Sequence, residues 1–124
     1  MTLPALSALR PTRAEISLDY LEVNLRLLRE RIGLRALIGV VKANAYGHGA
    51  VPIARCLQAA GIDHLAVALL EEAVELRQAG VTVPILVMGA LTPEQMEEVA
   101  RWEATPALFR ADQLEALERC AAAL

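Results

Sequence analysis

The chain has 124 residues, a formal net charge of −3, 56% hydrophobic residues and a mean hydropathy of +0.40. This length suits one domain, and the interspersed charges argue against a basic face that would bind nucleic acid. No apolar run of about 18 residues predicts a membrane span, and Met1 to Arg10 lacks the basic start and apolar core of a signal peptide.

The first half of the chain alternates strand patterns with helix patterns. Apolar residues at every second position predict a half-buried strand over 14–18, and leucines at helical spacing predict a helix over 21–32. A strand over 36–41 that is apolar on both faces follows. The next helix is expected to open at Pro52 and close at Gly61.

The second half repeats a strand followed by a helix about every 20 residues. The predicted units are strand 65–69 with helix 71–79, strand 84–88 with a helix from Thr92 to about Trp102, and strand 106–109 with helix 112–123. Strands that are apolar on both faces belong in a parallel sheet covered by helices. We therefore expect an α/β domain.

Without the first strand, the pattern contains four βα units, whereas a closed TIM (β/α)8 barrel needs eight units and about 250 residues. The chain also ends inside a helical pattern, at Cys120–Leu124, without a stop signal. We expect about half of such a barrel, preceded by one extra N-terminal strand, with unpaired sheet edges and an exposed interior. A small complete open sheet of flavodoxin type is the alternative, because about 125 residues can build one.

The segment that carries chemistry is Val-Val-Lys-Ala-Asn-Ala-Tyr-Gly-His-Gly, residues 40–49. Lys42 lies at the carboxyl end of a predicted strand, where α/β folds place their chemistry. Apolar neighbours are expected to lower its pKa, and a neutral amine can attack an aldehyde to form an imine. The turn around Gly47 and Gly49 could offer backbone N–H groups to an anion, and the Tyr46 hydroxyl could donate to a phosphate.

A lysine beside an anion-binding turn fits pyridoxal 5'-phosphate (PLP), a phosphorylated aldehyde. The alternative is a solvated lysine at a strand end. The turn also lacks the glycine spacing of a P-loop or a dinucleotide-binding motif.

Residues 40–49 closely resemble the PLP-attachment segment of bacterial alanine racemases, and the likeness extends to 13–19, 65–73 and 84–89. The resemblance implies a PLP-binding TIM barrel followed by a β-rich C-terminal domain, in a cytoplasmic homodimer. Residues 1–124 would then be the N-terminal part of the barrel domain. In that family the first strand joins the C-terminal domain, so the strand predicted over 14–18 would lack its partner.

The resemblance also implies the site. Lys42 would bind PLP as a Schiff base and act as the base on one face of the substrate, and Tyr46 would hydrogen-bond the cofactor phosphate. Met88 stands where the family usually has a leucine near the cofactor, a volume-conserving difference. The implied reaction interconverts L-alanine and D-alanine by α-proton abstraction, which supplies D-alanine for cell-wall peptidoglycan.

In the family, the second base is a tyrosine from the C-terminal domain of the other subunit. Tyr20, in the first predicted helix, is no substitute for it. We therefore expect the 124 residues alone to racemise alanine poorly. The alternatives are a racemase for serine or lysine, a non-catalytic PLP-binding module, and a half-barrel that acts only when paired with a second chain.

Other reactive residues have structural interpretations. The two cysteines, Cys56 and Cys120, are far apart in sequence and have no metal-type spacing, so we expect reduced thiols and no metal site. His48 is expected to be structural and His64 to lie in a surface turn. Residues expected to pack in the interior are Trp102 and Phe109, and those expected on a solvated helix face are Glu72 and Glu75.

Overall fold

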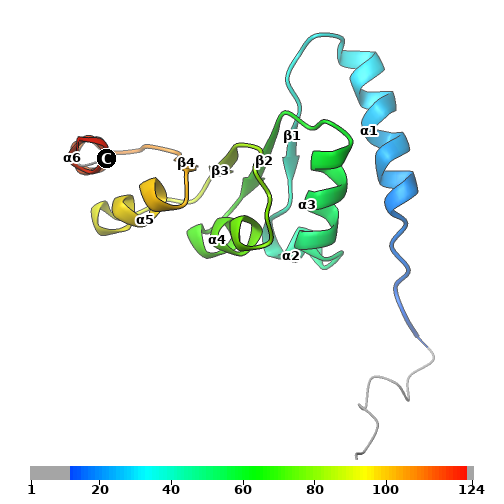
Figure 1. Cartoon of the computed structure of the whole chain (residues 1–124), viewed down its shortest axis with the longest axis horizontal. Helices are drawn as coiled ribbons and strands as arrows, with labels where there is room; N and C mark the ends of the chain where they lie inside the picture. The colour runs from blue at the N-terminus through cyan, green and yellow to red at the C-terminus, as the bar shows by residue number, and fades with distance from the viewer. Residues whose placement is uncertain (1–11, 123–124) are drawn as a thin grey trace, which may run out of the picture.

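The computed structural model describes residues 12–122, which form a parallel sheet with helices packed against it (Figure 1). The elements in chain order are α1 (Leu18–Ile32), β1 (Ile38–Val40), α2 (Lys42–Tyr46), α3 (Ala50–Ala59), β2 (His64–Val67), α4 (Leu70–Gln78), β3 (Ile85–Val87), the 3-10 helix η2 (Pro93–Gln95), α5 (Met96–Arg101), β4 (Ala104–Pro106) and α6 (Ala111–Ala121).

The four strands lie in the order β1-β2-β3-β4, and every neighbouring pair is parallel. This confirms the predicted parallel α/β sheet. A flavodoxin-type sheet would instead place β2 on the outer side of β1, since its strand order is 2-1-3-4-5. Sequential order of βα units is the arrangement of a TIM barrel wall, so the strand order decides between the two architectures that the sequence left open.

The two faces of the sheet differ in exposure. On the face turned to the helices, the side chains are fully buried; examples are Leu65, Val67 and Ile85. On the opposite face, Ile38 is 50% exposed and Val40 is 41% exposed. The expectation that strand 36–41 is buried on both faces is therefore wrong for its second face, because no described element packs there.

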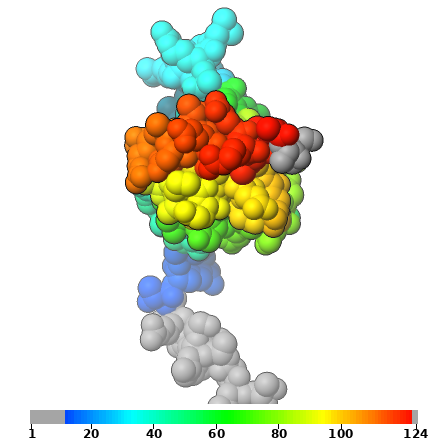
Figure 2. Space-filling model, turned by 90° about the vertical axis from the view of Figure 1, so that its left-hand side faces the viewer, coloured from blue at the N-terminus to red at the C-terminus, as the bar shows by residue number. Residues whose placement is uncertain are grey.

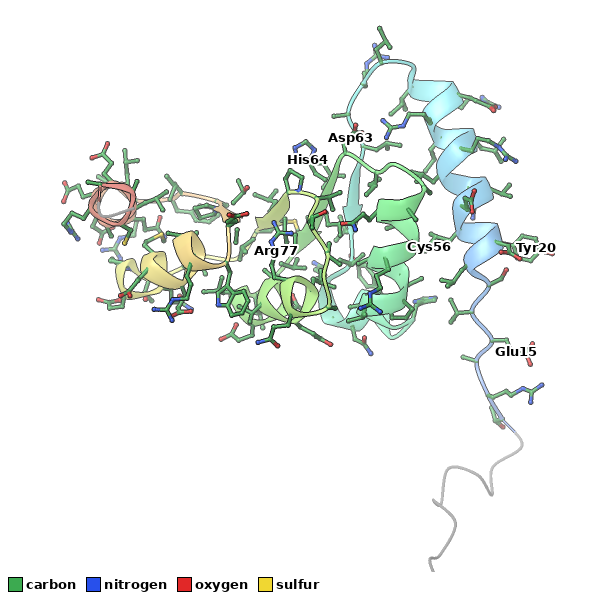
Figure 3. All side chains as sticks on the ribbon, in the orientation of Figure 1. Glu15, Tyr20, Cys56, Asp63, His64 and Arg77 are labelled. Atoms are coloured by element: carbon green, nitrogen blue, oxygen red, sulfur yellow. The ribbon has the colours of Figure 1, made fainter. Side chains whose placement is uncertain are left out.

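The strand predicted over 14–18 is not formed. Residues 12–17 carry no secondary structure and are exposed, and Figure 3 shows Glu15 on a segment that leaves the body of the molecule. The helix begins at Leu18, because the Ser17 hydroxyl accepts the backbone N–H of Tyr20 as an N-cap. Alternating residues alone do not make a strand here, since no described strand lies beside them to complete a ladder.

The last helix, α6, lies across α5 at one end of the molecule (Figure 2). Gln113 attaches it to the preceding loop: its side-chain oxygen accepts the backbone N–H groups of Phe109 and Arg110, and its amide donates to the carbonyl oxygen of Leu91. Both polar atoms of this buried glutamine side chain therefore have hydrogen-bond partners, as buried polar groups require. Phe109 itself is 64% exposed, so its expected packing role is wrong in this structure.

Arg77 joins three segments on the helix side of the sheet. Its guanidinium donates to four backbone carbonyls, those of Val81, Val83, Trp102 and Glu103, at 2.7 to 3.1 Å. Figure 3 shows the side chain between α4 and the sheet. Burial lowers the pKa of Arg77, and the charge of Glu103 opposes this effect. The planar fork of one arginine therefore fixes both the start of β3 and the turn before β4.

Asp63 performs a similar function at the amino ends of β1 and β2, the same end of the parallel sheet as the Arg77 contacts. Its carboxylate accepts the backbone N–H of Leu37 at 2.7 Å and pairs with Arg29 of α1 at 2.6 Å. The hydrogen bond from Leu37, followed by the one from Arg29, holds the pKa of Asp63 below its usual value. The first helix is thus tied to the entrance of β1 through the residue that precedes β2.

We predict that Arg77→Lys lowers the free energy of unfolding by about 2 kcal/mol. One lysine ammonium cannot reach all four carbonyl oxygens, because two of them precede β3 and two precede β4. Urea unfolding measures the loss. Arg55→Lys is the matched control, since Arg55 donates to the single carbonyl of Ala79. Equal losses in the two variants would contradict the assignment.

We also predict a pH dependence that belongs to Asp63. Because its folded pKa lies below the unfolded value of about 3.9, its stabilisation is complete above that pH and disappears as the pH falls through the folded value. Thermal midpoints of the unaltered protein and Asp63→Asn should therefore differ near neutral pH and converge in acid. Glu15→Gln is the control, because among residues 12–122 Glu15 pairs with nearby Arg13 alone. Parallel curves across the pH range would refute the prediction.

Candidate cofactor site at the carboxyl ends of the strands

Lys42 lies one residue beyond the end of β1, after Val41, and opens α2. Val41 is buried on the helix side of the sheet. If the alternation of β1 continued past Val41, Lys42 would lie on the open side, with Ile38 and Val40. The side chain of Lys42 is half-buried. The predicted position of the lysine at the carboxyl end of a strand is confirmed, and its attachment to a cofactor stays a prediction.

Met88 reaches the same side from β3. Val87 is buried against the helices, which places the next residue on the open face. The ladder continues beyond the strand, because the Met88 N–H donates to Val67 O at 2.9 Å and the Gly89 N–H donates to Ala68 O at 3.0 Å. The structure therefore brings Lys42 and Met88 to one edge of the sheet, with the end of β2 between them.

The chain that leaves Lys42 is a left-handed turn built from residues other than glycine. Ala43, Asn44 and Ala45 have φ/ψ values of 50°/51°, 55°/45° and 51°/48°, and Tyr46 has a φ of 56°. For residues with a Cβ atom, this conformation costs about 1–2 kcal/mol each. A run of such residues persists only where the surroundings hold it, and strain of this kind gathers at functional sites.

Hydrogen bonds within the segment stabilise much of this left-handed conformation. Gly47 N–H donates to Ala43 O, Gly49 N–H donates to Asn44 O, and the Ala50 N–H donates to the Asn44 side chain at 2.7 Å. His48 contributes as well, because its Nδ1 lies 2.8 Å from Ala45 O. That contact is consistent with the structural role expected for His48.

The same bonds correct one expectation about the turn. The backbone N–H groups with partners inside the protein are those of Ala43, Ala45, Gly47, His48, Gly49 and Ala50. These donors are not available to an anion, so the glycine turn is not the phosphate cradle that its sequence suggested. Tyr46 is 60% exposed, and its hydroxyl forms no hydrogen bond with any described residue.

Glu72 corrects a second expectation. Instead of lying on a solvated helix face, it is half-buried, and its carboxylate accepts the backbone N–H groups of Ala43 at 2.6 Å, Ala68 at 2.8 Å and Leu69 at 3.0 Å. Burial raises the pKa of Glu72, but these hydrogen bonds and the charge of Lys42 lower it, and the net pKa is below the usual value. The carboxylate is therefore charged at neutral pH, and it interacts electrostatically with Lys42.

Gly89 permits a close backbone contact at the same edge. A Cβ atom at this position would lie 2.3 Å from the carbonyl oxygen of Ala68, which no side chain can occupy. Position 89, where the chain leaving β3 approaches the end of β2, can therefore hold only glycine.

Other parts of the described chain offer less chemistry. A surface hollow of about 570 Å³ between α5 and α6 is lined by residues such as Glu97, Ala116 and Arg119, and by none of Lys42, Tyr46 and Met88. Residues 12–122 contain no cluster of three or more metal-ligating side chains. Within the same range, no helix is both long and apolar enough to cross a membrane.

Comparison with known proteins agrees with this geometry. Residues 16–124 match the family model described as "Alanine racemase, N-terminal domain". The chain belongs to the alanine racemase family. Curated relatives named alanine racemase include those of Sorangium cellulosum (48% identical, 88% of this chain and 30% of the relative) and Aromatoleum aromaticum (49% identical, 94% and 33%).

Solved structures show the same likeness. The alanine racemase of Clostridium difficile 630 has a TM-score of 0.79 at 36% identity, over 85% of this chain and 28% of that one. The histidine racemase of Leuconostoc mesenteroides has a TM-score of 0.76 at 28% identity, over the same shares. The chain thus spans about 30% of the length of the alanine racemases that it matches.

Three residues of this site escaped sequence reasoning. Asn44 carried a weak signal, since asparagine tolerates left-handed conformations better than other residues with a Cβ atom. Glu72 carried none, because the residue at the N-cap, Leu69, is not the serine or threonine that marks a capping box. Gly89 resembled an ordinary turn glycine. A glycine is required there because the carbonyl oxygen of Ala68 lies too close for a Cβ atom, which the sequence does not show.

We predict that Asn44→Ala loosens the turn that follows Lys42. The variant loses the acceptor of the Ala50 N–H and places a less tolerant residue in the left-handed region, so the free energy of unfolding should fall by about 1–2 kcal/mol. Hydrogen exchange of the Ala50 amide should accelerate in parallel. Asn44→Asp is the control, because it keeps the oxygen acceptor; a loss as large as that of Asn44→Ala would argue against this role.

Proposed function

We propose that this protein acts as a PLP-dependent amino-acid racemase on alanine, and that Lys42 is the residue to which the cofactor is attached. The observation that supports the proposal is the position of Lys42, just beyond the carboxyl end of β1 in a barrel-type sheet. Membership of the alanine racemase family gives the same substrate and reaction.

The residues of the site fit PLP at two points. The Lys42 amine offers the nucleophile that an aldehyde requires, and the exposed Tyr46 hydroxyl offers a donor to a phosphate. Because the glycine turn uses its own N–H groups internally, Tyr46 is the donor that this segment contributes. Met88 would pack beside the cofactor from β3. When bound, PLP stabilises the negative charge that remains after the α-proton is removed.

In the proposed reaction, Lys42 takes or returns the α-proton on one face of alanine. The apolar side chains beside it on the open face, Ile38 and Val40, would keep water away from its amine if that face is covered in the working enzyme. The base on the opposite face, the homodimer, the cytoplasmic location and the supply of D-alanine for peptidoglycan stay predictions from the family resemblance.

A second substrate has a specific observation in its favour. The histidine racemase of Leuconostoc mesenteroides shares this fold at 28% identity, so the part of the fold described here serves more than one side chain. Comparing racemisation rates for alanine, serine, lysine and histidine distinguishes the candidates. A preference for alanine is expected.

Covalent attachment provides the direct test. Incubation with PLP, reduction with borohydride and peptide mapping should place the cofactor on Lys42, and Lys42→Arg should remove the label and the racemisation together. Arg55→Lys is the control, since it adds a lysine on an exposed surface. Lys42 is the only lysine of the 124 residues, so the informative outcomes are the presence of a label on the unaltered protein and its absence at position 55 of the control variant. A missing label on the unaltered protein, an equal label at position 55 of the control, or an undiminished racemisation rate in Lys42→Arg would refute the proposal.

A further inference from the structure

We propose that Glu72 is a positioning residue for Lys42: its carboxylate fixes the left-handed turn after Lys42 against the start of α4. This inference rests on the proposed attachment of PLP to Lys42. It concerns a contact between two segments 29 residues apart in sequence.

The two oxygens of Glu72 have different partners. Oε2 accepts the N–H groups of Ala68 and Leu69, which precede α4, and so caps that helix. Oε1 accepts the N–H of Ala43 at 2.6 Å. Capping requires only the first set, because a glutamate at the third helical position caps by reaching the N-cap residue of its own helix. The contact with Ala43 is therefore an addition to the cap.

The Ala43 N–H belongs to the peptide group that joins it to Lys42. A hydrogen bond to this group fixes the plane of the peptide, and with it the direction in which the Lys42 Cα carries its side chain. The contact also acts at the first residue of the strained run, where the left-handed conformation begins. Without it, the turn is free to move towards less strained backbone conformations.

The chemistry of a carboxylate suits both tasks. It presents acceptors only, on both oxygens, whereas an amide presents one acceptor and one donor. Glutamine at this position would set an N–H donor against the N–H of Ala43 or against those of the cap. The negative charge also lies near the charge of Lys42, which favours this placement of the two side chains.

The experiment separates capping from positioning in the intact protein. Glu72→Gln is made alone and together with Leu69→Ser, because a serine at the N-cap supplies its own oxygen to the start of α4. Glu71→Gln is the control: it removes the same charge from the neighbouring, exposed position. Two quantities are measured for each variant, the thermal midpoint and the rate at which PLP becomes reducible onto Lys42.

We expect Leu69→Ser to restore the thermal midpoint of Glu72→Gln while the attachment rate stays about tenfold below that of the unaltered protein. Glu71→Gln and Leu69→Ser alone should attach PLP normally. The inference is overturned if the double variant attaches PLP at the normal rate, since Glu72 is then a cap only. If the unaltered protein does not attach PLP to Lys42, the proposed function fails, and this inference fails with it.

Discussion

Backbone groups at the ends of the strands need hydrogen-bond partners that the sheet cannot supply, and a few polar side chains supply them. Glu72 accepts three N–H groups around the carboxyl ends of β1 and β2, and Arg77 donates to four carbonyls before β3 and β4. Asp63 and Gln113 satisfy the entrance of β1 and the loop before α6. Each of these side chains joins segments that are distant in sequence. The hydrogen bonds that satisfy the backbone groups of the loops therefore also fix the positions of the loops relative to one another.

This arrangement explains how a strained segment can follow the lysine. The left-handed turn is unfavourable for each alanine in it, yet it begins at a residue that Glu72 holds and ends at glycines that adopt positive φ without cost. Between them, Asn44 bonds to both the backbone and the start of α3. Four of the five described residues that combine a Cβ atom with a positive φ therefore lie in the segment that connects the proposed nucleophile to the body of the protein.

Periodicity was a good guide to the elements and a poor guide to their surroundings. Residue spacing predicted α1, α3, α4, α5, α6 and the four paired strands, but not α2. The strand β4 covers Ala104–Pro106 and not the predicted 106–109, because Arg77 fixes the turn at Glu103. The strand predicted over 14–18 failed because a strand also needs a neighbour. Lys42 was predicted from its place after a strand and from the family resemblance, and Met88 from the resemblance alone.

The left-handed conformation of Ala43 and Ala45 could not be predicted, since alanine has no preference for it and only contacts from other segments impose it. The same reason applies to Glu72. A helical projection places it on the outer side of α4, but the first turn of a helix faces the chain that precedes it, and here that chain runs beside the lysine turn.

The open face of the sheet has a thermodynamic consequence. Ile38 and Val40 already contact water in the folded state, so unfolding residues 12–122 exposes less new apolar surface than unfolding a sheet covered on both sides. The heat-capacity increment of unfolding and the denaturant m-value both scale with that newly exposed surface. We therefore expect the curve of unfolding free energy against temperature to be flatter for the described residues than for a sheet covered on both faces, and more strongly curved once a partner covers this face.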